Sequence, residues 1–168
     1  MKSNKFKTTK LLIIFILIIF VIINIFKYIK IELQKKESDD IITNMLIIQG
    51  KVKLISGEAE VNGNEDNYVG AKLSEYNNQD IKSTILNIGI EESSFENYYI
   101  LNKENLDNMG ISSELKNIQD NEYIVNYKDT EVIYIKGINI DDDVKYKLSD
   151  ILIKEEPKKW ILYNRIGE

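Results

Sequence analysis

The chain has 168 residues and a formal net charge of −5, which is distributed unevenly along its length. Residues 1–36 carry eight lysines and one glutamate (+7), whereas residues 37–168 carry 14 basic and 26 acidic residues (−12). The acidic part lacks the dense positive surface that nucleic-acid binding requires, and the absence of cysteine and histidine excludes disulfides, thiolate zinc sites and histidine-based acid–base catalysis.

An apolar run at residues 11–29 follows a basic tail formed by residues 1–10. About 19 helical residues span roughly 28 Å, which is close to the thickness of the hydrocarbon core of a bilayer. Asn24 is the one polar residue within 11–26, and Tyr28 suits the headgroup region. The run therefore predicts a single transmembrane helix, with the lipid bilayer as its partner.

A cleaved signal peptide is the alternative interpretation of this apolar run. Cleavage needs small residues directly after the run, but KYIKIELQKK follows it and the first alanine is Ala59. We therefore expect a permanent anchor. Lysines are nearly balanced across the run, and a short basic tail usually stays in the cytoplasm. The expected arrangement in the cell membrane is a cytoplasmic N-terminus and an extracytoplasmic C-terminal domain.

Residues 30–61 are predicted to form a juxtamembrane amphipathic helix. Ser38, followed by two aspartates, is typical of the start of a new helix. Beyond it, apolar residues recur at spacings of four and three, which places them on one helix face: Ile41, Met45, Ile48, Val52 and Ile55. This stripe suits packing on the domain's own sheet, which we favour, or packing against neighbouring subunits in a homo- or hetero-oligomer.

Residues 62–168 are predicted to form the extracytoplasmic head domain. Its first half indicates a short helix over residues 79–90 and a strand at 98–101, where aromatic and branched side chains gather. Asn102 is placed to cap a second short helix, which Gly110 would end in the left-handed conformation.

The second half of the head predicts antiparallel strands. Residues 122–127 and 131–136 form a hairpin pattern, and residues 160–163 (WILY) suit a last edge strand. An acidic turn is predicted to separate two further short strands, residues 137–140 and 144–148. The predicted fold class is α+β: an N-terminal transmembrane helix that continues into an amphipathic helix, then a small antiparallel sheet with short helices.

The acidic turn is the one cluster that resembles a site for a hard cation, and its candidate ligands are Asp141, Asp142 and Asp143. The EF-hand spacing is not met, so we favour a solvated turn between strands. Adjacent carboxylates such as Glu91 and Glu92 point in different directions and do not make an acid–base pair. No glycine-rich phosphate loop occurs. We predict no enzymatic activity and no cofactor.

Ten tyrosines occur in the chain, and many fall in the predicted strands. Half-buried aromatic rings commonly pack on sheets, and this interpretation is favoured over a ligand platform. Tyrosines buried against the helix would indicate a structural protein. An anchored binding module for a peptide, glycan or cation would instead show an exposed groove lined by Tyr98, Tyr123, Tyr127 and Tyr134.

The order of the segments resembles that of bacterial type IV pilin-like and pseudopilin-like (prepilin-like) proteins. Four blocks carry the resemblance: NMLIIQGKVK (44–53), YYILNKENLDNMGI (98–111), NEYIVNYKDTEVIYIKG (121–137) and KYKLSDI (145–151). It implies a non-enzymatic structural or accessory protein of the cell envelope. A prepilin has a glycine before its cleavage point and a glutamate within its apolar run, whereas residues 8–10 are TTK and residues 11–26 contain no acid.

Overall fold

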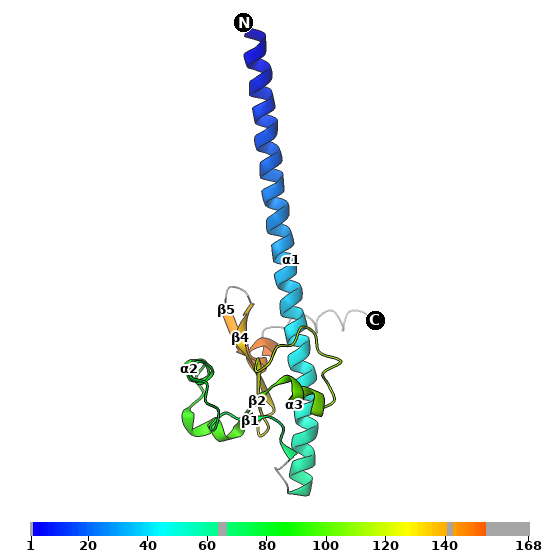
Figure 1. Cartoon of the computed structure of the whole chain (residues 1–168), viewed down its shortest axis with the longest axis vertical. Coiled ribbons are helices and arrows are strands. Elements are labelled where there is room, and N and C mark those ends of the chain that lie inside the picture. Colours follow the sequence, from blue (N-terminus) through cyan, green and yellow to red (C-terminus); the bar gives the residue numbers. More distant parts are fainter. Residues whose placement is uncertain (1, 64–66, 141–142, 154–168) are drawn as a thin grey trace, which may run out of the picture. The chain divides into compact units, whose positions relative to one another are not determined.

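The computed structural model describes the backbone of residues 2–63, 67–140 and 143–153, and side chains from Phe15 onward. The chain divides into two compact units, Met1–Asp39 and Asp40–Glu168. Helix α1 (Lys2–Asn62) supplies residues to both units, and the second unit adds a five-stranded sheet with short helices (Figure 1). The α+β class and the long N-terminal helix are therefore as predicted.

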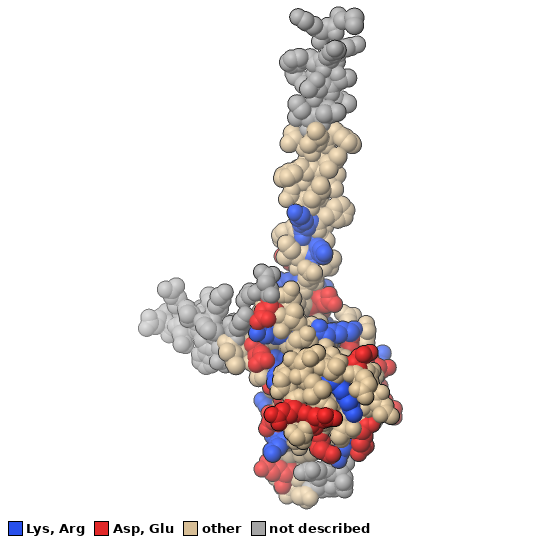
Figure 2. Space-filling view, turned by 90° about the vertical axis from the view of Figure 1, so that its left-hand side faces the viewer, with Lys and Arg blue, Asp and Glu red and all other residues tan. Residues whose placement is uncertain are grey.

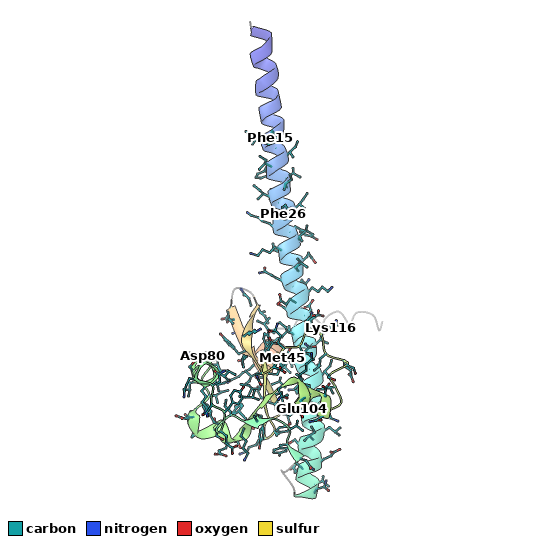
Figure 3. The ribbon with its side chains drawn as sticks, in the orientation of Figure 1. Phe15, Phe26, Met45, Asp80, Glu104 and Lys116 are labelled. Atoms are coloured by element: carbon teal, nitrogen blue, oxygen red, sulfur yellow. The ribbon has the colours of Figure 1, made fainter. Side chains whose placement is uncertain are left out.

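The first unit is helical, and its described side chains are exposed throughout residues 15–37. Figure 3 shows them directed outward on all sides of α1, from Phe15 through Phe26 and beyond. A search of the described residues finds no helix that is long and apolar enough to cross a membrane. The predicted span begins at Leu11, and its side chains before Phe15 lie outside the described residues. The transmembrane assignment stays a prediction.

Two polar side chains of α1 bond to the preceding turn of the helix. The Asn24 amide donates to the carbonyl of Phe20 at 2.7 Å, and the Ser38 hydroxyl donates to the carbonyl of Gln34 at 3.0 Å. Back-bonding of this kind belongs to residues inside a helix, not to N-caps. The prediction that Ser38 begins a new helix is therefore wrong.

The sheet of the second unit is antiparallel, and its strands lie in the order of the sequence. Its strands are β1 (Ala71–Lys72), β2 (Tyr98–Leu101), β3 (Tyr123–Asn126), β4 (Glu131–Ile140) and β5 (Asp143–Lys147). The short helices are α2 (Gln79–Asn87), the 3₁₀ helix η2 (Glu92–Asn97) and α3 (Lys103–Asn108), and residues 148–153 are also helical.

The caps and turns of these elements are those expected from the sequence in most places. Asn102 caps α3 in a reciprocal capping box with Asn105, and Gly110 has a φ of +73°. The predicted separate strand at residues 137–140 is wrong, because β4 continues through it. A register shift between Ile133 and Ile138 bends β4, and Gly137 (φ +70°) lies in this irregular stretch.

The core has one hydrophobic cluster on each face of the sheet. Alternation along β3 sends Tyr123 and Val125 to the cluster that α1 covers, and Ile124 to the other. That second cluster is covered by α2 and η2, through Ile81, Ile85 and Phe95. Within the second unit, α1 and α2 thus lie on opposite sides of the strands (Figure 1).

The predicted apolar stripe of α1 lies in the first of these clusters. Met45, Ile48 and Val52 are fully buried, Ile55 is nearly so, and Ile41 packs at the edge. Burial of each such side chain contributes about 1.5–3 kcal/mol. The stripe packs on the sheet of its own chain, the alternative that the sequence favours, so it does not offer these side chains to a neighbouring subunit.

We expect Ile48→Ala to lower the free energy of unfolding of the second unit by about 2–5 kcal/mol, because it leaves a cavity under the sheet. Leu46→Ala is the matched control, since Leu46 is exposed on the same helix and should cost no more than about 0.5 kcal/mol. Denaturant unfolding of the full chain in detergent, followed by near-ultraviolet circular dichroism, measures both. Equal effects of the two substitutions would contradict the packing described above.

Candidate functional site

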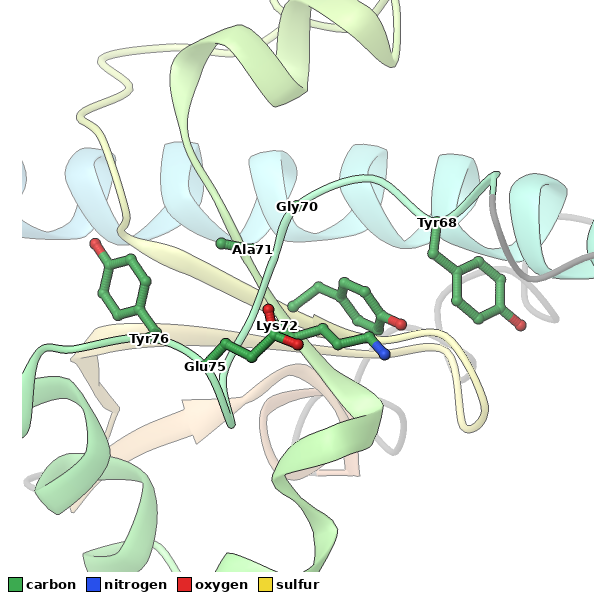
Figure 4. Close-up of a pocket in the computed structure, with 7 residues that line it drawn as sticks. Tyr68, Gly70, Ala71, Lys72, Glu75 and Tyr76 are labelled. Atoms are coloured by element: carbon green, nitrogen blue, oxygen red, sulfur yellow. The ribbon is translucent and has the colours of Figure 1, made fainter.

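A hollow borders strand β1, at the edge of the sheet. It consists of two adjoining pockets of ≈ 560 Å³ and ≈ 720 Å³ that share Tyr68, Lys72 and Tyr99. The first follows β1 between Tyr68 and Tyr76, which lie at its two ends (Figure 4). The second extends to the end of α1. Volumes of about 300–1,000 Å³ are usual for ligand pockets.

Gly70 brings the chain close to β2 at the start of this hollow. Its φ is +118°, a conformation that side-chain-bearing residues rarely adopt. A Cβ atom added there would lie 2.9 Å from the carbonyl oxygen of Ile100. Only glycine therefore allows β1 to approach β2 this closely, and the wall of the hollow depends on this residue.

Three tyrosine rings pack together where the two pockets meet. The Tyr68 ring stacks on that of Tyr127, with centroids 4.2 Å apart and planes 3° apart. Tyr99 meets both rings edge-on, at 5.7 Å from Tyr68 and 5.2 Å from Tyr127. Stacked and edge-to-face pairs of this kind each add about 0.5–1.5 kcal/mol beyond the area that they bury.

The Tyr127 hydroxyl ties the segment that enters β1 to the core of the sheet. It accepts a hydrogen bond from the backbone N–H of Val69 at 3.0 Å and donates one to the carbonyl of the same residue at 2.9 Å. Burial raises the pKa of Tyr127 to about 12, against a partly compensating effect of the Val69 bond. The phenol thus stays neutral near pH 7, as a structural group and not as a base.

Charged side chains of both signs surround the hollow. Lys72 and Glu75 line the first pocket, and Glu60, Glu96 and Lys128 join at the second. Among the residues that the structure describes, no carboxylate lies within ion-pair distance of the Lys72 ammonium group. Its described lining therefore combines aromatic surface, the ammonium groups of Lys72 and Lys128, and three carboxylates, which suits binding through side chains and backbone.

The four tyrosines of the predicted groove do not line an exposed groove together. Tyr123, Tyr127 and Tyr134 are buried, and all three belong to the cluster beneath α1. Asn44 of α1 donates to the Tyr123 hydroxyl at 3.1 Å, and burial raises the pKa of Tyr123 to about 12. Tyr98 is half-buried on the opposite face. Of the four, Tyr127 alone reaches the hollow.

The acidic turn gives no metal site among the described residues. Asp141 and Asp142 lie outside them, and Asp143 begins β5, where it forms an ion pair with Lys145 at 2.5 Å. Within the described part of the chain, no three carboxylates are grouped in a way that would hold a metal ion.

Sequence reasoning missed Tyr68, Lys72 and Tyr76, which line the hollow. The stretch around them shows no strand periodicity, because β1 has only two residues. The sequence signal that could have found them is Gly70, which lies between two apolar residues. A glycine in such a position often marks a close approach of two backbone segments.

Comparison of the chain with protein-family models, with curated proteins and with solved structures finds no match in any of the three.

Alkaline pH should destabilise the second unit through its two buried phenols. Because the folded pKa values of about 12 exceed the unfolded value of 10.0, the folded state binds more protons between these limits. The stability that these phenols contribute is therefore complete below pH 10 and is lost as the pH rises toward 12. Ultraviolet difference absorbance should show Tyr123 and Tyr127 titrating late, together with a falling denaturation midpoint.

Tyr127→Phe separates this effect from general alkaline unfolding. It leaves the N–H and carbonyl of Val69 without the phenol, which should cost about 1–3 kcal/mol near neutral pH. One late-titrating tyrosine should disappear from the absorbance curve. Exposed Tyr28→Phe is the control for stability and should leave the free energy of unfolding near neutral pH unchanged. Unchanged late titration in Tyr127→Phe would contradict the assignment.

Proposed function

We propose that this chain is a non-enzymatic, single-pass membrane protein, a pilin-like structural or accessory component of the cell envelope. The observation that supports this most directly is the apolar surface of α1 between Phe15 and Ile29. Large apolar side chains between Phe15 and Ile29 are 42–68% exposed, and they cover the helix on all sides. A helix with apolar side chains all round suits a bilayer or a protein core.

The charge pattern supports the same proposal. In Figure 2, the described part of α1 begins with a stretch that shows no charged side chain and is followed by lysines, drawn in blue. Acidic side chains, drawn in red, are spread over the visible face of the second unit. Lys27 and Lys30 are placed to reach the headgroups, since lysine stems extend along apolar surface toward water. We propose a cytoplasmic N-terminus and an extracytoplasmic Asp40–Glu168 unit.

A structural role also agrees with the arrangement of the tyrosines. Tyr123 and Tyr134 are packed together with ring centroids 5.4 Å apart, beneath α1. Phenols held in this way stabilise the fold and are not available to substrates. Burial of the tyrosines against the helix is what we expect of a structural protein.

Self-association through the juxtamembrane part of α1 would use the face opposite the buried stripe. Leu46, Leu54 and Val61 are 43%, 53% and 86% exposed, and added Cβ atoms at Gly50 and Gly57 would meet nothing within 4 Å. Small residues let helix backbones approach closely, and the flanking apolar side chains supply the contact area. This face is our proposal for a homo- or hetero-oligomer.

An anchored binding module is the second candidate function, and the hollow beside β1 favours it. It is open, it is of ligand size and it is lined by Tyr68, Lys72 and Tyr76, whose side chains are only partly buried. The two functions are compatible, because the hollow and the exposed face of α1 involve different residues.

The anchor is tested by placing charge in the apolar run. We expect Ile18→Lys combined with Ile22→Lys to release the chain from membranes in alkaline carbonate, since lysine near the bilayer centre costs about 2.5–3.5 kcal/mol on insertion scales. Exposed Lys30→Ala and Lys35→Ala are controls that should stay in the pellet. Because the chain has no cysteine, Ser113→Cys reports orientation through an impermeant maleimide. Extraction of the native chain by carbonate would contradict the proposal.

The proposed association is tested by disulfide crosslinking in membranes. Leu54→Cys should form covalent dimers under mild oxidation, because the residue is exposed at the middle of the open face of α1. Ser113→Cys, exposed in a turn outside α1, is the control and should remain monomeric. Equal dimer yields from the two positions would exclude this face as the interface.

A further inference from the structure

We propose that strand β1 accepts an extended basic peptide of a partner protein as a sixth strand, held between Tyr68 and Tyr76. This inference rests on the second candidate function and names its ligand class. It is carried by three features of the described residues: the backbone N–H of Lys72, which β1 turns outward, the hollow along its outer edge, and the charges around that hollow.

The register of β1 determines which of its backbone groups are left for a new strand. Ala71 pairs with Ile100 and Lys72 with Tyr99, and the N–H of Leu73 donates to the carbonyl of Tyr98 at 2.8 Å. Antiparallel pairs alternate between hydrogen-bonded and non-hydrogen-bonded, so Lys72 occupies the non-hydrogen-bonded position. Its N–H therefore points away from β2, and none of the described residues accepts from it, whereas its carbonyl accepts from the N–H of Glu75 at 3.2 Å.

The hollow provides space along this outward-facing backbone. Tyr68 and Tyr76 bound it, with Lys72 and Glu75 between them (Figure 4). An added strand would lie about 4.7–4.9 Å from β1, and its successive side chains would point alternately to the face of Tyr68 and to the face of Tyr76. Main-chain bonding with pockets for alternate side chains is how sheet edges commonly bind peptides.

The charges around the hollow favour a basic peptide. Three carboxylates, on Glu60, Glu75 and Glu96, outnumber the two ammonium groups, on Lys72 and Lys128. Residues 37–168 carry a net charge of −12, so the long-range field also attracts cations. An acidic peptide would gain from Lys72 and Lys128 but would be opposed by the remaining surface.

The opposite edge of the sheet does not offer an equivalent site. Lysines occupy two of the five positions of β5, Lys145 and Lys147, and a register shift separates the β4–β5 pairs at Ile133 and Ile138. Edge lysines and bulges are the usual means by which proteins prevent pairing with another strand. β1 also carries a lysine, Lys72, but its pairing with β2 has no register shift and its outward N–H faces the hollow.

The test uses the full chain in neutral detergent and fluorescence anisotropy of a labelled eight-residue peptide of alternating valine and lysine. Lys72→Pro removes the outward N–H without removing a bond to β2, and Ala71 before it is already extended, as a residue preceding proline prefers. Lys72→Ala is the matched control, because it keeps the N–H and loses only the ammonium group. We expect binding by the native chain and by Lys72→Ala to agree within about threefold, and Lys72→Pro to bind about fivefold or more weakly.

Two peptide controls need no change in the protein. Two peptides are N-methylated at every second backbone nitrogen, one at the odd positions and one at the even positions. One of them should lose binding and the other should keep it, because only one set of N–H groups faces the edge of the sheet. The corresponding peptide of valine and glutamate should bind more weakly than the lysine peptide. Both results are expected if β1 forms a sixth strand with a basic peptide.

Absence of binding, or binding that is indifferent to Lys72→Pro and to both N-methylated peptides, would overturn the proposal. Stronger binding of the glutamate peptide would overturn the assignment of charge. Circular dichroism of each variant confirms that its fold is intact. Carbonate extraction of the membranes from which each variant is purified, before detergent is added, reports on the anchor independently, so that failure here is distinguishable from failure of the proposed membrane function.

Discussion

The second unit depends on the burial of one face of α1 against strands β2, β3 and β4. Met45, Ile48 and Val52 supply apolar contacts, and Asn44 beside them supplies polar ones. The Asn44 amide donates to the carbonyl of Lys116 at 2.8 Å, and its oxygen accepts from the N–H of the same residue at 3.0 Å. This pairing satisfies a buried amide and fixes the loop before β3, so the helix orders both the sheet and the connection that leads into it.

The same face of the sheet positions the candidate site. Tyr127 follows β3, lies in the cluster beneath α1 and bonds to both backbone groups of Val69. The residue that precedes Gly70 and β1 in the chain is therefore attached to the core through a phenol. Gly70, which follows it, permits the close approach of β1 to β2. The residues that shape the hollow at the edge of the sheet also stabilise the core of the second unit. The walls of the hollow are therefore held in place by the fold itself, and little ordering would be needed on binding.

The sequence predicted those elements whose signals are local. Asn102, Gly110 and the β3–β4 hairpin follow from capping and turn preferences, and the α1 stripe follows from helical spacing. Two of the failures have different physical causes. Ser38 carries a capping signal, but a helix that continues satisfies its hydroxyl internally. β1 is too short to show periodicity, and its place at the hollow depends on Tyr99 and Tyr127, far along the chain.

The two parts of α1 use the same residue types with different periodicity, and this difference separates their environments. Between Phe15 and Ile29 apolar residues occupy every side of the helix, whereas between Ile41 and Ile55 most of them gather on the face that the sheet covers, with Leu46 and Leu54 as the exposed exceptions. A sheet can bury only one face of a helix, so it selects the second pattern. The first pattern needs apolar surroundings on all sides, which a bilayer supplies. The proposed anchor thus follows from the geometry of burial as much as from hydropathy, because no single protein surface would cover that part of the helix.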